Sequence, residues 1–234
     1  MSWGQNKLGR LAVAALLVTG AASAAANVLV VRSSGPSAKS FPPGRSLPDN
    51  ARIPLQSGDT VVLLSSGGTR TFRGPGTFSP SQAVQAGPRT VQGNSGRARV
   101  GAVRSAGILP SGPTTIWHVD VSTGGTMCLA NPRGLMLWRP DAERQATVTI
   151  IGHDGASFDV TWPAGSATAA WPANLPVADG ATYQLRQPGT AVPTRVTFKT
   201  LQSVPDDVQG VAEALIQNDC PEQLDLLVAS QPSE

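Results

Sequence analysis

Pairs of carboxylates are the first candidates for chemistry in this chain. Asp154/Asp159 and Asp206/Asp207 have the side chains that a glycosidase uses, one carboxyl to protonate the leaving group and one to attack or to activate water. Asp154, however, lies in a His-Asp-Gly turn, and Asp206 and Asp207 precede a predicted helix, whose positive end acidic residues stabilise. We therefore interpret both pairs as structural.

A serine nucleophile is the second candidate. The segment 93–96, Gly-Asn-Ser-Gly, resembles the serine loop of chymotrypsin-like proteases, in which a histidine base and an orienting carboxylate activate the hydroxyl. In that family the histidine and the aspartate precede the serine, whereas His118 and His153 both follow Ser95. An unrecognised hydrolase stays an alternative, and it requires a cleft that holds one of these histidines beside a serine or a carboxylate.

The remaining groups give no metal or cofactor site. His118 lies beside Asp120 on a predicted strand, where a single histidine is more often packed or half exposed than a ligand or a pH-sensitive contact. Neither His118 nor His153 is closely spaced with a cysteine, and the chain has no phosphate loop or dinucleotide fingerprint. We predict a protein that is not an enzyme, with no catalytic residue, no metal and no cofactor.

Cys128 and Cys220 are the only cysteines of the chain, and we predict that they form a disulfide. Two thiols in an exported protein are most simply paired, although a pair of buried free thiols is an open alternative. The bond would close a loop of about 90 residues and stabilise the fold by about 4–5 kcal/mol in the chain-entropy model.

Export itself is predicted from residues 1–26. Lys7 and Arg10 form a positive head, an uncharged apolar run follows over 11–22, and small residues offer cleavage positions over 22–26. The apolar run of about a dozen residues is too short to cross a bilayer, which takes roughly 20. We expect a cleaved signal peptide, with an uncleaved anchor as the alternative, a mature chain without a transmembrane span, and a periplasmic or secreted location.

Charge is divided unevenly along the mature chain. Residues 27–119 carry ten basic and two acidic side chains, whereas residues 120–234 carry six basic and thirteen acidic ones. A basic half of this kind can bind an anionic cell-wall or lipopolysaccharide polymer or a second copy's acidic end, or it can simply be a solvated surface. We expect no nucleic acid, because the chain is exported and no aromatic platform accompanies its arginines. The candidate basic face consists of Arg70, Arg73, Arg89, Arg97, Arg99 and Arg104.

The elements that position these groups are expected to be mainly strands, because aromatic (5%) and charged (14%) residues are few while Gly (25) and Pro (20) are abundant. Residues 27–32 and 60–64 are apolar runs that predict strands, and Gly67 and Gly68 predict the two central residues of a hairpin turn. Residues 33–50, rich in Pro, Ser and Gly, predict an extended loop.

The order of a Gly58-Asp59 turn, an apolar strand, a glycine turn, a second strand and Gly-Pro-Gly resembles the small all-β domain of FecR-like periplasmic proteins. The resemblance covers residues 27–81 and implies a FecR-like β-domain there. Regulatory members of that family carry a cytosolic segment and a membrane span ahead of the domain, through which they control a sigma factor. The predicted leader stands in that place here, so we do not infer a signalling role.

Residues 82–113 predict a basic linker rich in Gly, Ser and Pro, too poor in large apolar residues to fold alone. Over 114–202 short apolar runs alternate with turns about every dozen residues, which predicts a sandwich of two sheets. The Trp, Pro and Tyr pattern over 137–185 resembles immunoglobulin-like or fibronectin-like modules, which often follow FecR-like domains in exported bacterial proteins. The predicted strands are 114–121, 127–130, 135–139, 146–151, 157–162, 168–171, 182–186 and 194–201, and the predicted core anchors are Trp138, Trp162 and Trp171.

Residues 203–234 predict a short helical tail. Apolar residues fall on one helical stripe over 208–216, and a second short helix begins at Pro221, with Cys220 between the two. The predicted fold class is therefore mainly β, with a FecR-like domain, an immunoglobulin-like sandwich and this tail. The leading hypothesis is a non-catalytic interaction protein of the cell envelope whose partner is an envelope protein, and the alternative is a binder of anionic envelope polymer.

Overall fold

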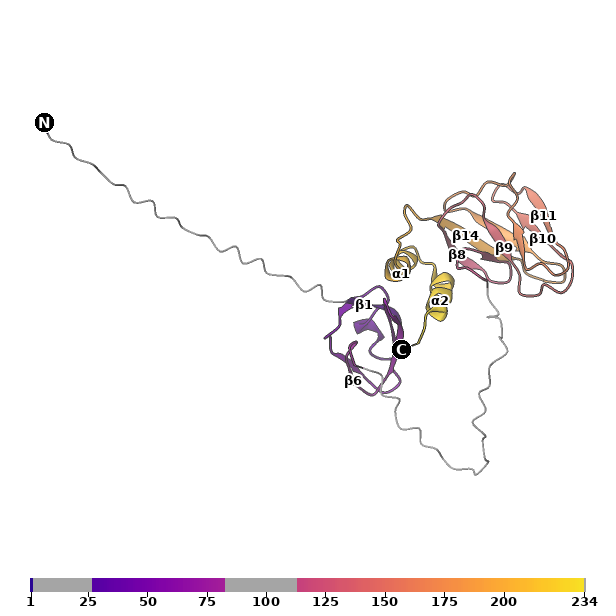
Figure 1. Ribbon diagram of the computed structural model, residues 1–234. Helices are drawn as coiled ribbons and strands as arrows, with labels where there is room; N and C mark the ends of the chain where they lie inside the picture. Colours follow the sequence, from indigo (N-terminus) through magenta and orange to yellow (C-terminus); the bar gives the residue numbers. More distant parts are fainter. Residues whose placement is uncertain (2–26, 83–112, 234) are drawn as a thin grey trace, which may run out of the picture.

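The computed structural model describes Met1, residues 27–82 and residues 113–233 (Figure 1). Residues 2–26 of the predicted signal peptide and nearly all of the predicted linker 82–113 lie outside these residues. So do Ser95 and four residues of the candidate basic face, which are Arg89, Arg97, Arg99 and Arg104. The described part is mainly β with two short C-terminal helices, as the sequence predicts.

The first unit (residues 27–82) consists of two small antiparallel sheets. A four-stranded sheet has the order β2-β1-β4-β5, and a two-stranded sheet joins β3 to β6. The strands are β1 (Asn27–Ser34), β2 (Ser46–Pro48), β3 (Ile53–Leu55), β4 (Thr60–Ser65), β5 (Gly68–Arg73) and β6 (Gly76–Phe78). The segment predicted as an extended loop thus contains β2 and a short 3-10 helix at Ala38–Ser40, because β2 pairs with β1.

The central strands β1 and β4 are buried on both faces. Their runs Val-Leu-Val-Val and Val-Val-Leu-Leu are continuous rather than alternating, as expected for strands that are covered on two sides. One face, with Val30 and Leu63, packs within the first unit. The other face, with Leu29 and Leu64, packs against the C-terminal helices.

The hairpin between β4 and β5 differs from the prediction by one residue. Ser65 pairs with Gly68, so the loop consists of Ser66 and Gly67 rather than of Gly67 and Gly68. Gly68 has a φ of 142°, and a Cβ at this position would lie 2.3 Å from the carbonyl oxygen of Pro232. The second glycine is therefore required by the close approach of the C-terminus.

The second unit (residues 113–202) is a sandwich of a five-stranded and a three-stranded sheet, with orders β11-β10-β13-β14-β8 and β12-β9-β7. Its strands are β7 (Val119–Asp120), β8 (Gly125–Leu129), β9 (Met136–Trp138), β10 (Ala146–Ile151), β11 (Ser157–Trp162), β12 (Thr168–Ala170), β13 (Thr182–Arg186) and β14 (Thr194–Thr200). Seven predicted strands are found within two residues of their bounds. The strand predicted over 114–121 is wrong except at β7, because Ile116 and Trp117 pack against the apolar cluster that joins β1, β4 and the C-terminal helices.

The three tryptophans predicted as core anchors are buried, with exposed fractions of 6% at Trp138, 1% at Trp162 and 8% at Trp171. Trp171 makes edge-on contacts with Tyr183 and Phe198, whose ring centroids lie 5.3 and 5.4 Å away. Side chains of both sheets share this core, so the sandwich is stabilised by apolar surface of its own.

Two helices, α1 (Val208–Gln217) and α2 (Pro221–Ser230), lie between the first unit and the sandwich (Figure 1). The carboxylate of Asp207 accepts a hydrogen bond from the Gly210 amide at 2.8 Å and caps α1. The sulfur atoms of Cys128 and Cys220 are 2.01 Å apart, so the predicted disulfide is confirmed, and it fixes the start of α2 to β8. One apolar cluster joins β1, β4, both helices and this disulfide.

Candidate functional site

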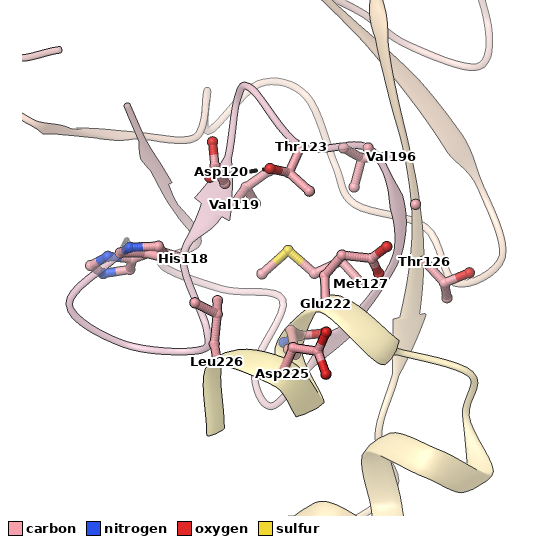
Figure 2. Close-up of a pocket in the computed structure, with 14 residues that line it drawn as sticks. His118, Val119, Asp120, Thr123, Thr126, Met127, Val196, Glu222, Asp225 and Leu226 are labelled. Carbon is pink, nitrogen blue, oxygen red and sulfur yellow. Dashed lines mark hydrogen bonds between the residues drawn. The ribbon is translucent and has the colours of Figure 1, made fainter. Parts of the chain in front are cut away.

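A cavity of about 350 Å³ lies between β7, β8 and the first turns of α2 (Figure 2). Strands β7 and β8 are edge strands of the two different sheets of the sandwich, so the cavity opens on the side where the sandwich is not closed by a further strand. We call it the edge pocket, and its lining includes His118, Asp120, Thr126, Met127, Glu222 and Leu226. The volume is within the range of small-ligand sites.

Asp120 forms one wall of the edge pocket, and its carboxylate is engaged in the turn that ends β7. It accepts hydrogen bonds from the Ser122 amide at 2.8 Å, from the Ser122 hydroxyl and from the Thr123 hydroxyl at 3.3 Å. An aspartate that bonds the backbone two residues later stabilises a turn of this kind. The negative charge of Asp120 therefore borders the pocket, and the hydrogen bonds of the turn fix the position of its carboxylate.

His118 is half-buried, and its Nδ1 atom is buried without a hydrogen-bond partner among the described residues. Burial lowers the pKa of His118 below its usual value, which favours the neutral ring. In Figure 2 the ring lies at the outer end of the pocket, away from Glu222. The hydrolase alternative needs a histidine bonded to a nucleophile or to a carboxylate, and no such bond of His118 is present within the described residues.

The outer edge of β8 forms the opposite wall, and Gln223 covers one position of it. The Leu201 amide donates to the Leu129 carbonyl at 3.0 Å, so the backbone N–H and C=O groups of Leu129 point toward β14. Because these groups point to opposite sides in successive residues of a strand, those of Cys128 point outward. There the backbone amide of Cys128 donates to the side-chain oxygen of Gln223 at 2.6 Å, and the side-chain nitrogen of Gln223 donates to the Cys128 carbonyl at 3.0 Å. Gln223 also donates to the Ile116 carbonyl at 2.8 Å. A buried glutamine therefore replaces a neighbouring strand at Cys128.

Thr126, two residues before Cys128, faces the same outer side. Its backbone amide and carbonyl have no hydrogen-bond partner within the described ranges 27–82 and 113–233. Unpaired backbone groups at a sheet edge are a template for another strand. The edge of β8 is thus covered at Cys128 and open at Thr126, where it borders the edge pocket.

Glu222 gives the open stretch a negative charge. A Cβ added to Gly125, whose φ is 122°, would lie 3.1 Å from a carboxylate oxygen of Glu222, so the glycine lets this carboxylate lie directly over β8. Glu222 is exposed and makes no ion pair with a described residue. Asp225, one turn later, pairs with Arg32 of β1. No lysine or arginine lines the pocket, so its electrostatic potential favours a cation.

The other carboxylates and the second histidine that could do chemistry lie apart. Asp154 accepts from the Ala156 amide at 3.0 Å in its turn, and Asp159 accepts from the Thr149 hydroxyl at 2.7 Å on the outside of the sandwich. The ring of His153 is exposed and lies 6.0 Å from that of Tyr183, outside the edge pocket.

The two described arginines of the candidate basic face both lie on β5. The guanidinium of Arg70 donates to the Pro80 carbonyl, and Arg73 is exposed at the end of the strand. Since side chains alternate along a strand, residues three apart point to opposite faces of β5. The remaining members of this set lie outside the described residues.

Sequence reasoning did not identify Gln223, Glu222 or Thr126 as site residues. One signal was available, because Cys220, Gln223, Leu224 and Leu227 share a helical stripe and a polar residue on such a stripe needs a buried partner. Two adjacent glycines such as Gly124 and Gly125 are typical of a turn, and Gly125 in addition permits the close approach of the Glu222 side chain to the strand.

Within the described residues no group of three or more His, Cys, Asp or Glu side chains is arranged to hold a metal ion. No helix of this described part is long and apolar enough to cross a membrane. Comparison of the chain with protein-family models, with curated proteins and with solved structures finds no match.

Proposed function

We propose that the protein is a non-catalytic exported protein that binds an envelope protein at the edge pocket. The observation that supports the proposal is the open edge of β8 at Thr126, which faces a cavity bordered by the uncompensated carboxylate of Glu222. These groups can hold a partner through backbone hydrogen bonds and charge. The predicted signal peptide and the resemblance of residues 27–81 to FecR-like periplasmic domains support an envelope location.

The proposal also fits the chemistry of the pocket walls. The carboxylate of Asp120 is engaged by the turn after β7, and His118 has no hydrogen bond that would make it a general base. The half-buried side chain of Leu226 provides apolar surface that a partner can cover, and the largely buried Met127 and Val196 also line the cavity. A rim of charge around an apolar floor is the usual anatomy of a binding surface.

Filling the edge pocket tests the proposal. Leu226→Trp enlarges a side chain that lines the pocket, whereas Val192→Trp places the same ring at a position that is 78% exposed and outside the pocket. We expect the unchanged protein and Val192→Trp to capture the same envelope protein in cross-linking from bacterial envelope extracts, and Leu226→Trp to lose it. Equal capture by all three proteins would contradict the proposal.

A second candidate function is the binding of an anionic cell-wall or lipopolysaccharide polymer through the first unit. This unit carries six basic residues against two acidic ones over 27–82, and one of the acids, Asp59, is buried with an exposed fraction of 2%. Its exposed cations that form no ion pair with a described residue are Lys39, Arg45, Arg52 and Arg73. Their charge faces solvent and favours a polyanion.

Sedimentation with purified sacculi separates the two candidates. Binding through the first unit should weaken steeply as the salt concentration rises, because exposed charges are screened. It should fall in the variant Lys39→Ser/Arg45→Ser/Arg52→Ser and stay unchanged in Leu226→Trp. Binding that does not depend on salt, or that is lost only in Leu226→Trp, would reject the polymer.

A further inference from the structure

We propose that the edge pocket binds an extended, cationic peptide segment of a partner protein, which adds as a strand to β8 at Thr126 and places a basic side chain against Glu222. This inference rests on the proposed function, since it gives the chemistry of the partner that the edge pocket binds. Three features of the described residues carry it: the unpaired stretch of β8, the sign of the charge beside it, and the way in which the C-terminal residues cover the edge of β5.

The backbone of β8 defines where the peptide pairs. Thr126 presents one amide and one carbonyl outward, and a strand alongside it would accept from the first and donate to the second. The side chain of Gln223 occupies the next outward position, at Cys128, with hydrogen bonds of 2.6 and 3.0 Å. An added strand therefore ends there, and the paired stretch is short.

The negative charge of the pocket lining determines that the peptide side chain placed against Glu222 is basic. Glu222 lies over Gly125 with its carboxylate 3.1 Å from the position of a Cβ, and Asp120 and Asp225 border the same cavity. Of the three carboxylates in the lining, Asp225 is paired with Arg32, and no lysine or arginine lines the cavity to compensate Glu222 and Asp120. Arginine or lysine on the peptide would compensate the charge of Glu222, whereas an acidic side chain would be repelled.

The apolar residues that line the cavity match the way in which side chains alternate along an extended peptide. Successive side chains of a strand point to opposite faces, so a basic residue directed at Glu222 is flanked by residues directed the other way. Met127 and Val196 line the same cavity and are largely buried, with exposed fractions of 7% and 3%. An apolar residue next to the basic one would contact the small apolar surface that they present there.

The chain already covers another edge by the same type of contact. Strand β5 is the outer strand of the first unit's sheet, and its Thr69 amide donates to the Pro232 carbonyl at 2.8 Å in a parallel bridge between Thr69 and Ser233. The C-terminal residues thus act as a short extra strand on β5. No described segment does so on β8 at Thr126.

The test uses the full-length, disulfide-bonded protein and a short fluorescein-labelled peptide, Gly-Thr-Val-Thr-Arg-Val-Thr-Gly, followed by fluorescence anisotropy. We expect saturable binding that becomes at least about tenfold weaker when the peptide arginine is replaced by glutamate. Glu222→Gln should weaken binding about fivefold, and the matched control Glu143→Gln, an exposed carboxylate outside the pocket, should leave it unchanged.

Methylation of peptide amides tests strand addition directly. N-methyl groups on the amides of one edge of the peptide should abolish binding, and N-methyl groups on the other edge should be tolerated, because only one edge donates to β8. The amide resonance of Thr126 should shift on binding. Equal loss with both methylated peptides, no shift at Thr126, or binding that ignores Glu222→Gln would overturn the proposal.

Two outcomes separate this inference from the proposed function. If Leu226→Trp loses the envelope partner while no cationic peptide binds, the pocket is a binding site and the strand-addition proposal is wrong. If the peptide binds the variant Arg97→Ser/Arg99→Ser/Arg104→Ser but not the unchanged protein, the chain's own segment competes for the edge, and the assignment to a partner protein is overturned.

Discussion

The outer strands β5 and β8 show two ways in which this protein treats an exposed sheet edge. On β5 the C-terminal backbone pairs with Thr69, and on β8 the side chain of Gln223 bonds both backbone groups of Cys128. Both covers come from the residues that follow the sandwich. A side chain covers only one outward position, whereas the next one, Thr126, stays open. An uncovered edge is normally blunted against association, so the difference supports the proposal that a partner binds at β8.

A similar contrast holds for the two units. The sandwich has a core shared by its own two sheets, whereas one face of the first unit's sheet packs in a cluster whose members outside that unit come mostly from α1 and α2. The helices also contact the sandwich through the disulfide at Cys128. The first unit should therefore depend on the helices for its stability, and the sandwich should depend on them much less.

The largest expected effect is the loss of the disulfide. Cys128→Ala/Cys220→Ala removes a cross-link between residues separated by 92 positions, which should lower the free energy of unfolding by about 4–5 kcal/mol in the chain-entropy model. Urea unfolding measured by tryptophan fluorescence and by hydrogen exchange of β1 and β4 checks this. We expect β1 and β4 to lose protection at lower urea than the sandwich does.

The control is the unchanged protein after reduction of the disulfide, which should behave like the double variant. Simultaneous unfolding of both units in the variant, or a loss of less than about 1 kcal/mol, would contradict the dependence of the first unit on the fixed helices.

Truncation of a buried leucine should give the next effect. Leu215→Ala in α1 and Leu185→Ala in β13 each remove a side chain with an exposed fraction of 0%, at a cost of about 2–5 kcal/mol. Hydrogen exchange should show Leu215→Ala exposing β1 and β4 while the sandwich stays protected. Leu185→Ala should expose the sandwich first, and the reverse pattern would refute the contrast between the units.

Replacement of the glutamine on β8 should have a smaller effect. Gln223→Met keeps the side-chain length but leaves the Cys128 amide and carbonyl without partners, which costs about 1–3 kcal/mol. Gln209→Met is the matched control, because Gln209 donates to the Asn27 and Leu64 carbonyls at 2.9 Å from a less buried position. Thermal unfolding should rank Gln223→Met below Gln209→Met, and equal or reversed stability would show that the cover on β8 contributes little.

Strands and helices of this chain could largely be predicted from local patterns. The bounds of β10, β11 and β13 follow from alternating residues between glycine turns, and the two helices follow from their apolar stripes and from the break at Cys220 and Pro221. These signals are local, because the spacing of apolar residues is fixed by the geometry of each element.

The arrangement of the elements was not predictable in the same way. The continuous apolar runs of β1 and β4 indicated buried strands, but nothing local to them identified residues 208–230 as the cover of their second face. The segment 114–118 alternates like a strand, yet Ile116 and Trp117 pack on the helices instead. Contacts between residues more than a hundred positions apart overrode the local pattern in both cases.

The candidate site shows the same limit. His118 and Asp120 could be selected from the sequence because their side chains can do chemistry. Thr126 contributes to the candidate site only through its backbone amide and carbonyl, which every residue type has. Glu222 belongs to the candidate site only because its carboxylate packs against Gly125 of β8, a contact that the sequence does not show. The proposed binding surface, made of an edge strand and one charge, could therefore be recognised only from the arrangement of the sheets and the helix.

The smallest expected effect is the pH dependence of the free energy of unfolding. It falls in different pH ranges for His118 in the edge pocket and for Asp59 in the first unit. Burial lowers the pKa of His118, so the unfolded chain binds the proton more readily, and this contribution to stability is present above pH of about 6.5 and is lost as the pH falls. For Asp59, burial raises the pKa, but hydrogen bonds from the Ser37 side chain and from the Ser37 and Gln56 amides lower it by more. The net decrease adds stability above pH of about 4 that is lost in stronger acid.

The two windows can be measured by urea unfolding between neutral pH and strong acid. His118→Gln should flatten the fall in stability between about pH 7 and pH 5 and leave the lower window unchanged, whereas Asp59→Asn should flatten only the fall below about pH 4. Asp59→Asn also weakens the contacts that hold the turn at Gly35, where a Cβ would lie 2.5 Å from the Asp59 carboxylate, so its loss of stability should already be visible at neutral pH. If His118→Gln instead steepened the fall above pH 5, the ring would be charged in the folded protein, and the edge pocket would carry less negative charge for a cationic partner than Glu222 and Asp120 imply.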